Sequence, residues 1–146
     1  MTDKPLFIVA VDESAGAARA AEHAAREAVL HGGTLLLVHV VEWSRFEVLP
    51  VRDLEVRHGH KEKALAQARK NIMAPLANRL VVSELEVATR IEFGHGAETV
   101  VEVARECGAG QIFVGRHAGS HATERFLGSM PTNLVRLSPV PVTVVP

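Results

Sequence analysis

The sequence LFIVAV at Leu6–Val11 decides the fold class. It is continuously apolar rather than alternating, which is typical of a strand buried on both faces of a sheet. A second such run, TLLLVHVV at Thr34–Val41, follows an alanine-rich stretch with helical spacing. Ser14 is suited to cap the start of that helix, and Gly32-Gly33 to end it. We therefore predict two parallel strands joined by a helix in a right-handed crossover.

Three shorter segments predict the remaining strands. Glu84–Phe93 alternates polar and apolar residues, as expected for a strand at or near an edge of the sheet. Gln111–Val114 is short and apolar, which indicates a buried strand. Val140–Val145 is flanked and interrupted by prolines, which cannot donate to a sheet ladder, so it suits only an edge.

Helical segments separate these strands. Gly59–Leu80 is predicted to be a long amphipathic helix, kinked or split near Pro75, after an irregular stretch over Glu42–His58. Further helices are predicted over Ala97–Cys107 and Pro131–Leu137. The fold class is therefore α/β: one domain over residues 1–146, with a five-stranded, parallel, open Rossmann-like sheet and helices on both faces.

Composition limits the partners. Hydrophobic residues make up 47% of the 146 residues and the formal net charge is −1, so we expect neither nucleic acid nor an anionic membrane as a partner. The first apolar run stops at Asp12, too early for a signal peptide or a membrane span. The single cysteine, Cys107, cannot form an internal disulfide, which favours a reducing, cytoplasmic location.

The segment GRHAGSHATERFLGS at Gly115–Ser129 is the first candidate for ligand binding. It leaves a buried strand, contains glycines and small polar residues, and enters a helix, where backbone N–H groups and the helix dipole favour an anion. Arg116 and Arg125 could add charge. The alternative is an ordinary loop in which Ser129 caps the following helix.

Asp12 is the second candidate, and two interpretations of it stay open. Its carboxylate follows a buried strand, so it can accept hydrogen bonds from a ribose hydroxyl or a base amino group. It can equally help Ser14 to cap the first helix. Asp12 and Gly115 end different central strands, and ligands of open α/β sheets lie where such strand ends flank one crevice.

Several segments together resemble the universal stress protein family. They are Val11-Asp12-Glu13-Ser14, His39-Val40-Val41, Val114-Gly115, Gly128-Ser129 and the closing Pro139–Val145. The resemblance runs over essentially the whole chain and implies an adenine nucleotide α-hydrolase-like fold. It also implies an adenine nucleotide ligand, ATP, ADP or AMP, with or without Mg²⁺, and a homodimer formed through the last strand.

The resemblance also implies the binding residues. In nucleotide-binding members the loop reads Gly, two residues, Gly, nine residues, then Gly with Ser or Thr, and the matching residues here are Gly115, Ala118, Gly128 and Ser129. The adenine would lie at the first and second strand ends and the phosphates along the loop. The implied binding residues are Ala10, Val11, Asp12, Val40, Val114, Gly115, Arg116, His117, Gly119, Gly128, Ser129 and Met130.

Two functions follow from different interpretations of this loop. The first is a regulatory module in which a bound nucleotide changes the surface offered to an unidentified protein partner. The second is a dimeric interaction protein that binds no nucleotide, which is favoured by Ala118 in place of the second glycine and by Pro131, which lacks an N–H.

Catalysis and metal binding find little support in the sequence. No nucleophile with a paired base is present, so no catalytic residue is assigned and slow ATP hydrolysis is the most we expect. The pairs His58 with His60 and His117 with His121 lack further ligands, so no metal site is predicted. His39, at a buried strand end, is expected to be a structural hydrogen-bonding group. Trp43 and Phe46 lie in a stretch that could cover the crevice as a flap.

Overall fold

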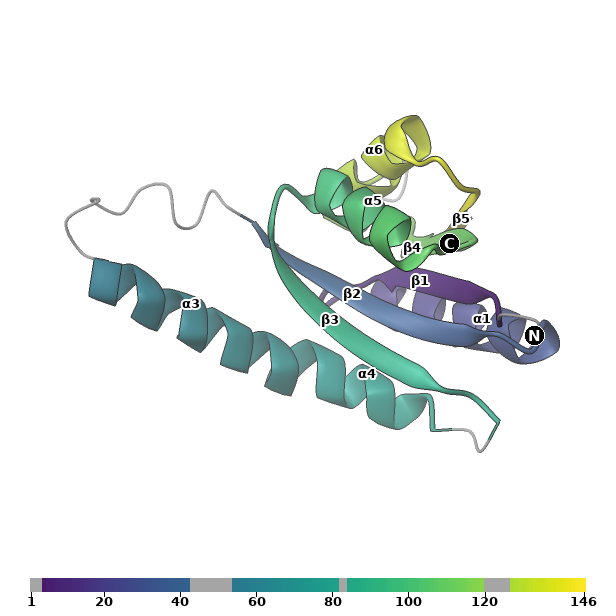
Figure 1. Ribbon diagram of the computed structural model, residues 1–146, viewed down its shortest axis with the longest axis horizontal. Helices are drawn as coiled ribbons and strands as arrows, with labels where there is room; N and C mark the ends of the chain where they lie inside the picture. The colour runs from purple at the N-terminus through teal and green to yellow at the C-terminus, as the bar shows by residue number, and fades with distance from the viewer. Residues whose placement is uncertain (1–3, 43–53, 82–83, 120–126) are drawn as a thin grey trace.

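The computed structural model describes residues 4–42, 54–81, 84–119 and 127–146. Within them, five strands form one parallel sheet in the order β3-β2-β1-β4-β5 (Figure 1). The strands are β1 Leu6–Ala10, β2 Thr34–Glu42, β3 Val87–Gly94, β4 Gln111–Gly115 and β5 Val142–Val145. The predicted fold class, an open parallel Rossmann-like sheet, is confirmed.

The strand order agrees with the hydrophobic patterns. β1 lies at the centre, where Ile8 is in register with Leu36 of β2 and Ile112 of β4. The alternating segment forms β3 at one edge and the proline-flanked segment forms β5 at the other. Both edge predictions are confirmed, because a strand with only one neighbour tolerates a wet face or missing N–H donors.

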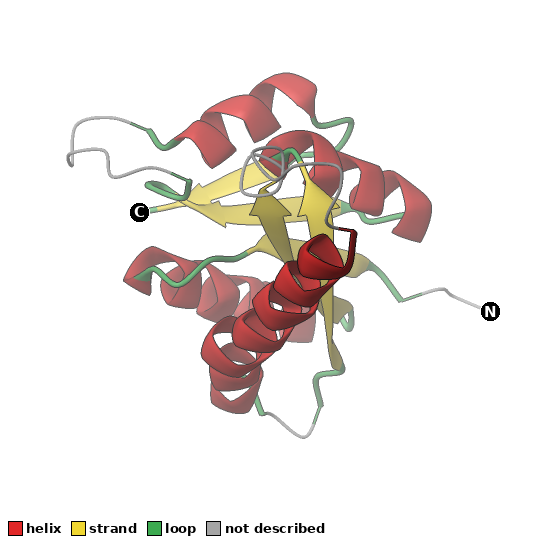
Figure 2. Ribbon diagram, turned by 90° about the vertical axis from the view of Figure 1, so that its left-hand side faces the viewer, coloured by secondary structure: helices red, strands yellow, loops and turns green. Residues whose placement is uncertain are grey.

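Helices cover both faces of the sheet (Figure 2). They are α1 Ala15–Leu30, α3 Leu54–Ala68, a π-helical turn η1 Arg69–Met73, α4 Ala74–Arg79, α5 Gly96–Cys107 and α6 Ser129–Leu137. One hydrophobic cluster joins α1, η1 and α4 to the sheet, and a second joins α5 and α6 to its opposite face. The domain is therefore a three-layer sandwich with the sheet in the middle.

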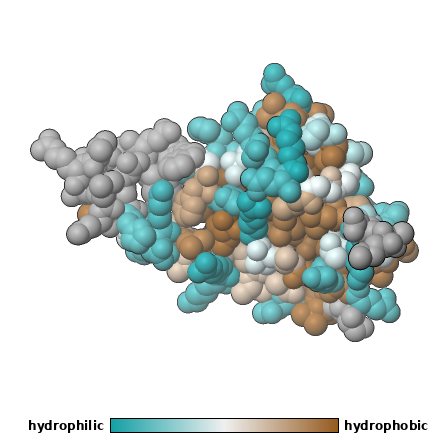
Figure 3. Space-filling view, in the orientation of Figure 1, coloured by the Kyte–Doolittle hydropathy of each residue, from teal (hydrophilic) through white to brown (hydrophobic). Residues whose placement is uncertain are grey.

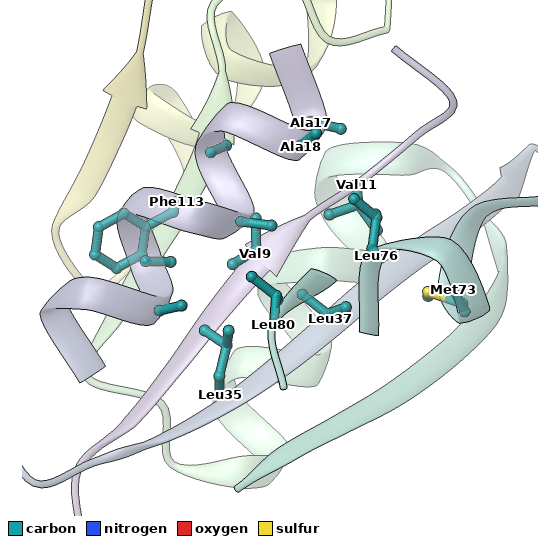
Figure 4. Close-up of a cluster of buried hydrophobic side chains, with 14 of the residues drawn as sticks. Val9, Val11, Ala17, Ala18, Leu35, Leu37, Met73, Leu76, Leu80 and Phe113 are labelled. Atoms are coloured by element: carbon teal, nitrogen blue, oxygen red, sulfur yellow. The ribbon is translucent and has the colours of Figure 1, made fainter. Parts of the chain in front are cut away.

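Alanines let α1 lie close against the sheet. Its buried side chains are all alanines, and they belong to one hydrophobic cluster with Val9, Leu35 and Phe113 of the sheet (Figure 4). The Ala17 N–H donates to the Ser14 Oγ at 3.2 Å, so the predicted N-cap is present. This cap fixes the direction in which the chain leaves β1.

The long helix begins earlier than predicted and ends, at Arg79, within one residue of its predicted end. It begins at Leu54 rather than Gly59, within the stretch that we expected to be irregular, and residues 43–53 lie outside the described part. Pro75 does interrupt it. The proline has no N–H, and the preceding turn widens into η1, in which the Ala74 N–H reaches the Arg69 carbonyl. The helix then continues as α4 to Arg79.

The surface is mixed in polarity. On the face seen in Figure 3, apolar residues are exposed over the middle of the molecule, with hydrophilic residues among and around them. Leu30 and Val81 are the most exposed large apolar residues of the described chain. None of the described helices is both long enough and apolar enough to cross a membrane.

Candidate functional site

A cleft of about 680 Å³ opens at the carboxyl ends of β1 and β2, beside the loop that follows β4. β1 pairs with β2 on one side and β4 on the other, so the strand order changes direction here, which is where open α/β sheets bind ligands. The ends of β1 and β2, the loop after β4 and the helix α3 form most of its walls. The cleft is lined by residues 10–14, 38–42, 117–119, Ala64, Gln67, Ala68, Ile72, Val100 and Met130.

The floor of the cleft is apolar and held by hydrogen bonds. Val11 and Val40 are buried residues whose remaining surface faces the cleft. The Val11 N–H donates to the Val38 carbonyl at 2.9 Å. The His39 Nδ1 lies 2.8 Å from the Val11 carbonyl, which can only accept, so Nδ1 carries the proton. His39 thus has the structural role predicted for it, and it fixes the end of β1.

Asp12 caps the entry to α1 and also lines the cleft. Its Oδ1 accepts the Ser14 N–H at 2.8 Å and the Ser14 hydroxyl, which in turn accepts from Ala17. Both bonds to Asp12 use the same oxygen. No described residue bonds to Oδ2, so the capping role leaves one carboxylate oxygen for a ligand. The two interpretations of Asp12 are therefore compatible.

The loop after β4 takes its left-handed turn at Gly119, not at Ala118. Gly119 has φ = 80°, and no non-glycine residue in the described chain has a positive φ. Ala118 is buried, its N–H donates to the Gly115 carbonyl at 3.2 Å, and its carbonyl accepts the Met130 N–H at 3.1 Å. The alanine therefore carries no backbone strain, because the next residue supplies the turn.

Gly128 brings the two ends of this loop together. A Cβ built there would lie 2.2 Å from the Ala118 carbonyl oxygen and 2.6 Å from the His117 carbonyl carbon. The Gly128 N–H donates to the Arg116 carbonyl at 2.8 Å. The Met130 N–H likewise donates to the Ala118 carbonyl, and Pro131 has no N–H. At the start of α6, the N–H groups of Gly128 and Met130 are therefore already bonded, and that of residue 131 is absent. The Ser129 Oγ also donates, to the Gly119 carbonyl at 2.9 Å.

The charge of the cleft is acidic. Asp12, Glu13 and Glu42 line it, and no lysine or arginine does so among the described residues. His117 lines it too, and its Nε2 is buried without a hydrogen-bond partner in the described part of the chain. An unpaired buried nitrogen costs about 1–3 kcal/mol, which a ligand hydrogen bond can offset.

Comparison with known proteins identifies the family to which this chain belongs. The sequence model of the universal stress protein family matches residues 7–146. The chain belongs to the universal stress protein family. A search of curated proteins finds no match for this family member.

Solved structures of similar architecture cover nearly the whole of this universal stress protein. Hypothetical protein MJ0577 is 26% identical with a TM-score of 0.84, over 99% of this chain and 96% of that one. A universal stress protein in complex with cAMP is 22% identical with a TM-score of 0.66, over 99% and 98% of the two chains. The universal stress protein from Archaeoglobus fulgidus in complex with dAMP is 22% identical with a TM-score of 0.66, over 100% of both. The last two likenesses establish the fold alone.

Most of the predicted binding residues of this universal stress protein line the cleft, and some do not. Those on its walls are Ala10, Val11, Asp12, Val40, His117, Gly119 and Met130. Val114 is fully buried and Arg116 is exposed, and neither lines the cleft. A Cβ on Gly115 would lie 3.0 Å from the backbone of Gly16, so this glycine serves the packing of β4 on α1. Ser129 lines an adjoining pocket.

The sequence prediction missed the wall contributed by α3. Ala64, Gln67 and Ala68 line the cleft. Their helix lies well after β2 in the sequence, beyond residues 43–53, so no local pattern linked it to the strand ends. Glu13 and Glu42 also line the cleft, and their positions in the sequence carried a signal, because they lie just beyond or at the ends of the first two strands.

Other predictions for the universal stress protein concern metals and the flap. The described residues contain no group of three His, Cys, Asp or Glu side chains that could hold a metal ion. His58 lies 3.9 Å from Glu62. Cys107 is exposed at the last turn of α5. Trp43, Phe46, His121 and Arg125 lie outside the described residues, so the flap stays a prediction.

Proposed function

We propose that this universal stress protein is a regulatory module that binds an adenine nucleotide, ATP, ADP or AMP, in the cleft at the ends of β1 and β4. The observation that carries this proposal is the cleft itself: about 680 Å³, at the point where the strand order reverses, with an apolar floor and a free carboxylate oxygen on Asp12. Structural relatives in complex with cAMP and with dAMP support the choice of an adenine nucleotide.

The lining residues suit the parts of such a ligand. Ala10, Val11 and Val40 offer an apolar surface to the flat base. The Oδ2 of Asp12 is an acceptor for a ribose hydroxyl or a base amino group. His117 and Gly119, on the loop after β4, lie where the phosphates would leave the ribose. In this proposal Gly115 and Gly128 shape the loop, and Val114 supports it from within.

A divalent cation fits the same cleft when the ligand is a polyphosphate. Mg²⁺ prefers oxygen ligands and usually binds through phosphates, water and one or two carboxylates. Asp12, Glu13 and Glu42 supply such carboxylates on the cleft wall. We therefore include Mg²⁺ in the proposal for ATP and ADP. It would reduce the repulsion between these carboxylates and the phosphates.

Replacing Asp12 with asparagine tests the ligand role of its carboxylate separately from its capping role. Asparagine keeps an oxygen that can accept from Ser14 but replaces the free Oδ2 with an amide group. We expect AMP affinity to fall about tenfold, because a hydrogen bond to a charged group contributes about 1.5–3 kcal/mol. Isothermal titration calorimetry of the purified protein measures this change.

The matched control is Glu84→Gln, which removes the same charge from an exposed residue that lines neither pocket. AMP affinity within twofold of wild type is expected for this control. Equal losses in both variants would mean that net charge, not the position of Asp12, governs binding. Before the titration, denaturing the protein and identifying any released small molecule by mass spectrometry shows which nucleotide it carries.

Two observations favour the alternative function, a dimeric interaction protein without a nucleotide. The N–H groups of Gly128 and Met130 are bonded within the loop, and acidic side chains line the cleft. Wild-type protein that binds none of AMP, ADP and ATP, and releases none on denaturation, would support this alternative. The function would then reside in the surfaces that the dimer presents to other proteins.

We further infer that the protein forms a cytoplasmic homodimer through β5. The N–H groups of Ile112 in β4 and of Arg116 just after it donate to the carbonyls of Pro141 and Val145, so these carbonyls face β4. Because backbone groups alternate along a strand, those of Val142 and Val144 face the free edge, where a second copy of β5 can pair. The lone Cys107, which is exposed, suits a reducing compartment.

Sedimentation equilibrium tests the dimer. We expect the wild-type protein to have twice the monomer mass and Val144→Pro to be a monomer. Proline removes the outward N–H and leaves the bonds to β4 intact. A Val144→Pro variant with the mass of a dimer would place the interface elsewhere.

A further inference from the structure

A second pocket, of about 430 Å³, adjoins the cleft. It lies between the start of α5 and one face of α6, and it shares Glu42, Gly119 and Met130 with the cleft. These three residues form the boundary between the two spaces. A ligand whose base occupies the cleft can therefore extend past Gly119 into the second pocket.

One face of α6 lines this pocket. Ser129, Asn133 and Arg136 are four and seven residues apart along the helix, so they lie on one side of it. Helical side chains lean toward the N-terminus of their helix. The Arg136 side chain is thereby directed along this face toward Asn133 and the boundary with the cleft.

The distribution of charge distinguishes the two spaces. Among the described residues that line them, Arg136 is the only lysine or arginine. It is exposed and forms no ion pair with another described residue. Glu42 and Glu98 also line the second pocket, so it is not basic throughout. Among the residues that line the two spaces, the fixed positive charge therefore lies on α6.

Among the described residues of the loop, few backbone donors remain for distal phosphates. The N–H groups of Gly128 and Met130 are bonded to Arg116 and Ala118, and Pro131 has none. A phosphate that reaches the start of α6 finds few free backbone donors there, so nearby side-chain donors would add to its binding. Asn133 carries an amide, and Arg136 carries a planar guanidinium that can donate two parallel hydrogen bonds to phosphate oxygens.

We propose that the second pocket binds the distal phosphates of a nucleoside polyphosphate, with Arg136 as their cationic donor. This inference rests on the proposed function, since the base must occupy the adjoining cleft. It makes Arg136 a specificity-determining residue: it contacts the β- and γ-phosphates of ATP, whereas AMP ends before reaching it. The site then distinguishes nucleotides by the number of their phosphates.

Calorimetric titration of AMP and ATP into wild-type protein, Arg136→Gln and Arg26→Gln tests this assignment. Arg26 is an exposed arginine of α1 that lines neither space, so its substitution makes the same charge change elsewhere. We expect Arg136→Gln to weaken ATP about tenfold, equivalent to about 1.4 kcal/mol, and AMP less than twofold. Arg26→Gln should change neither affinity by more than twofold.

The outcomes separate this inference from the proposed function. Unchanged ATP affinity in Arg136→Gln, or an equal loss for AMP and ATP, would overturn the role of Arg136 while leaving nucleotide binding in place. Wild-type protein that binds neither nucleotide would overturn the proposed function and this inference with it. Added salt should reduce the preference for ATP over AMP in the wild type more than in Arg136→Gln, because it screens the exposed charge.

Discussion

Gly128→Val is expected to reduce adenine nucleotide affinity at least tenfold in a protein that still folds. The new Cβ would lie 2.2 Å from the Ala118 carbonyl oxygen, so Ala118 and His117 must move away from the start of α6. That movement breaks the Gly128 to Arg116 and Met130 to Ala118 hydrogen bonds and displaces residues on the cleft wall. Crowding of this kind costs about 1–3 kcal/mol, less than a typical domain's stability.

Two control variants show whether the effect belongs to this contact. Gly59→Val makes the same chemical change in α3, where a Cβ would meet nothing within 4 Å, and should leave nucleotide affinity unchanged. Ala118→Gly removes a methyl from the same loop without relieving strain, so affinity should change less than twofold. Calorimetry with circular dichroism measures binding and folding together. Full affinity in Gly128→Val would disprove the close approach as a requirement for the site.

Phe113→Ala is expected to lower the free energy of unfolding by about 3–5 kcal/mol, the usual cost of emptying a buried aromatic site. Phe113 is fully buried in β4, and its ring meets those of Phe7 and His23 edge-on at centroid distances of 5.9 and 5.8 Å. It joins β4 to β1 and α1 shortly before Gly115, where β4 ends and the loop of the cleft begins. Urea unfolding followed by circular dichroism measures the change.

The matched control is Leu30→Ala, which shortens a large apolar side chain at the exposed end of α1. It should change stability by no more than about 0.5 kcal/mol. A loss below about 1 kcal/mol for Phe113→Ala would mean that the α1 face of the sheet repacks around the missing ring. The layered core would then tolerate volume changes that close packing ordinarily forbids.

The fold was largely predictable because burial leaves a local signature. Strands covered on both faces are apolar at every position, as in Leu6–Val11, and edge strands alternate or carry prolines. The start of α3 was not predictable in this way. The described side chains of its first turns, such as Val56 and His58, are exposed, and these residues show no buried face that would mark where the helix begins. Pro75 predicted an interruption of the helix, but it did not predict that the interruption would be a π-helical turn.

The site was predictable where it depends on strand ends. Val11, Asp12 and Val40 had to meet because the carboxyl ends of parallel strands share one edge. The sequence did not predict that Gly128 admits the backbone of Ala118. A glycine that makes room for a ligand and one that makes room for another backbone segment look the same in a sequence. The wall formed by Gln67 and Ala68 depends on how a distant helix packs, which no local pattern encodes.

The π-helical turn η1 has a consequence for how this family member can diverge. Beyond it, Leu76 and Leu80 fix the helix in the core. Before it, α3 extends past the sheet (Figure 1), and most of its described side chains are exposed or half-buried. The cleft wall at Ala64 and Gln67 belongs to the exposed part. Mutations can therefore accumulate in α3 and alter which ligand is accepted at little cost to folding, which gives natural selection and protein engineers a separately adjustable wall.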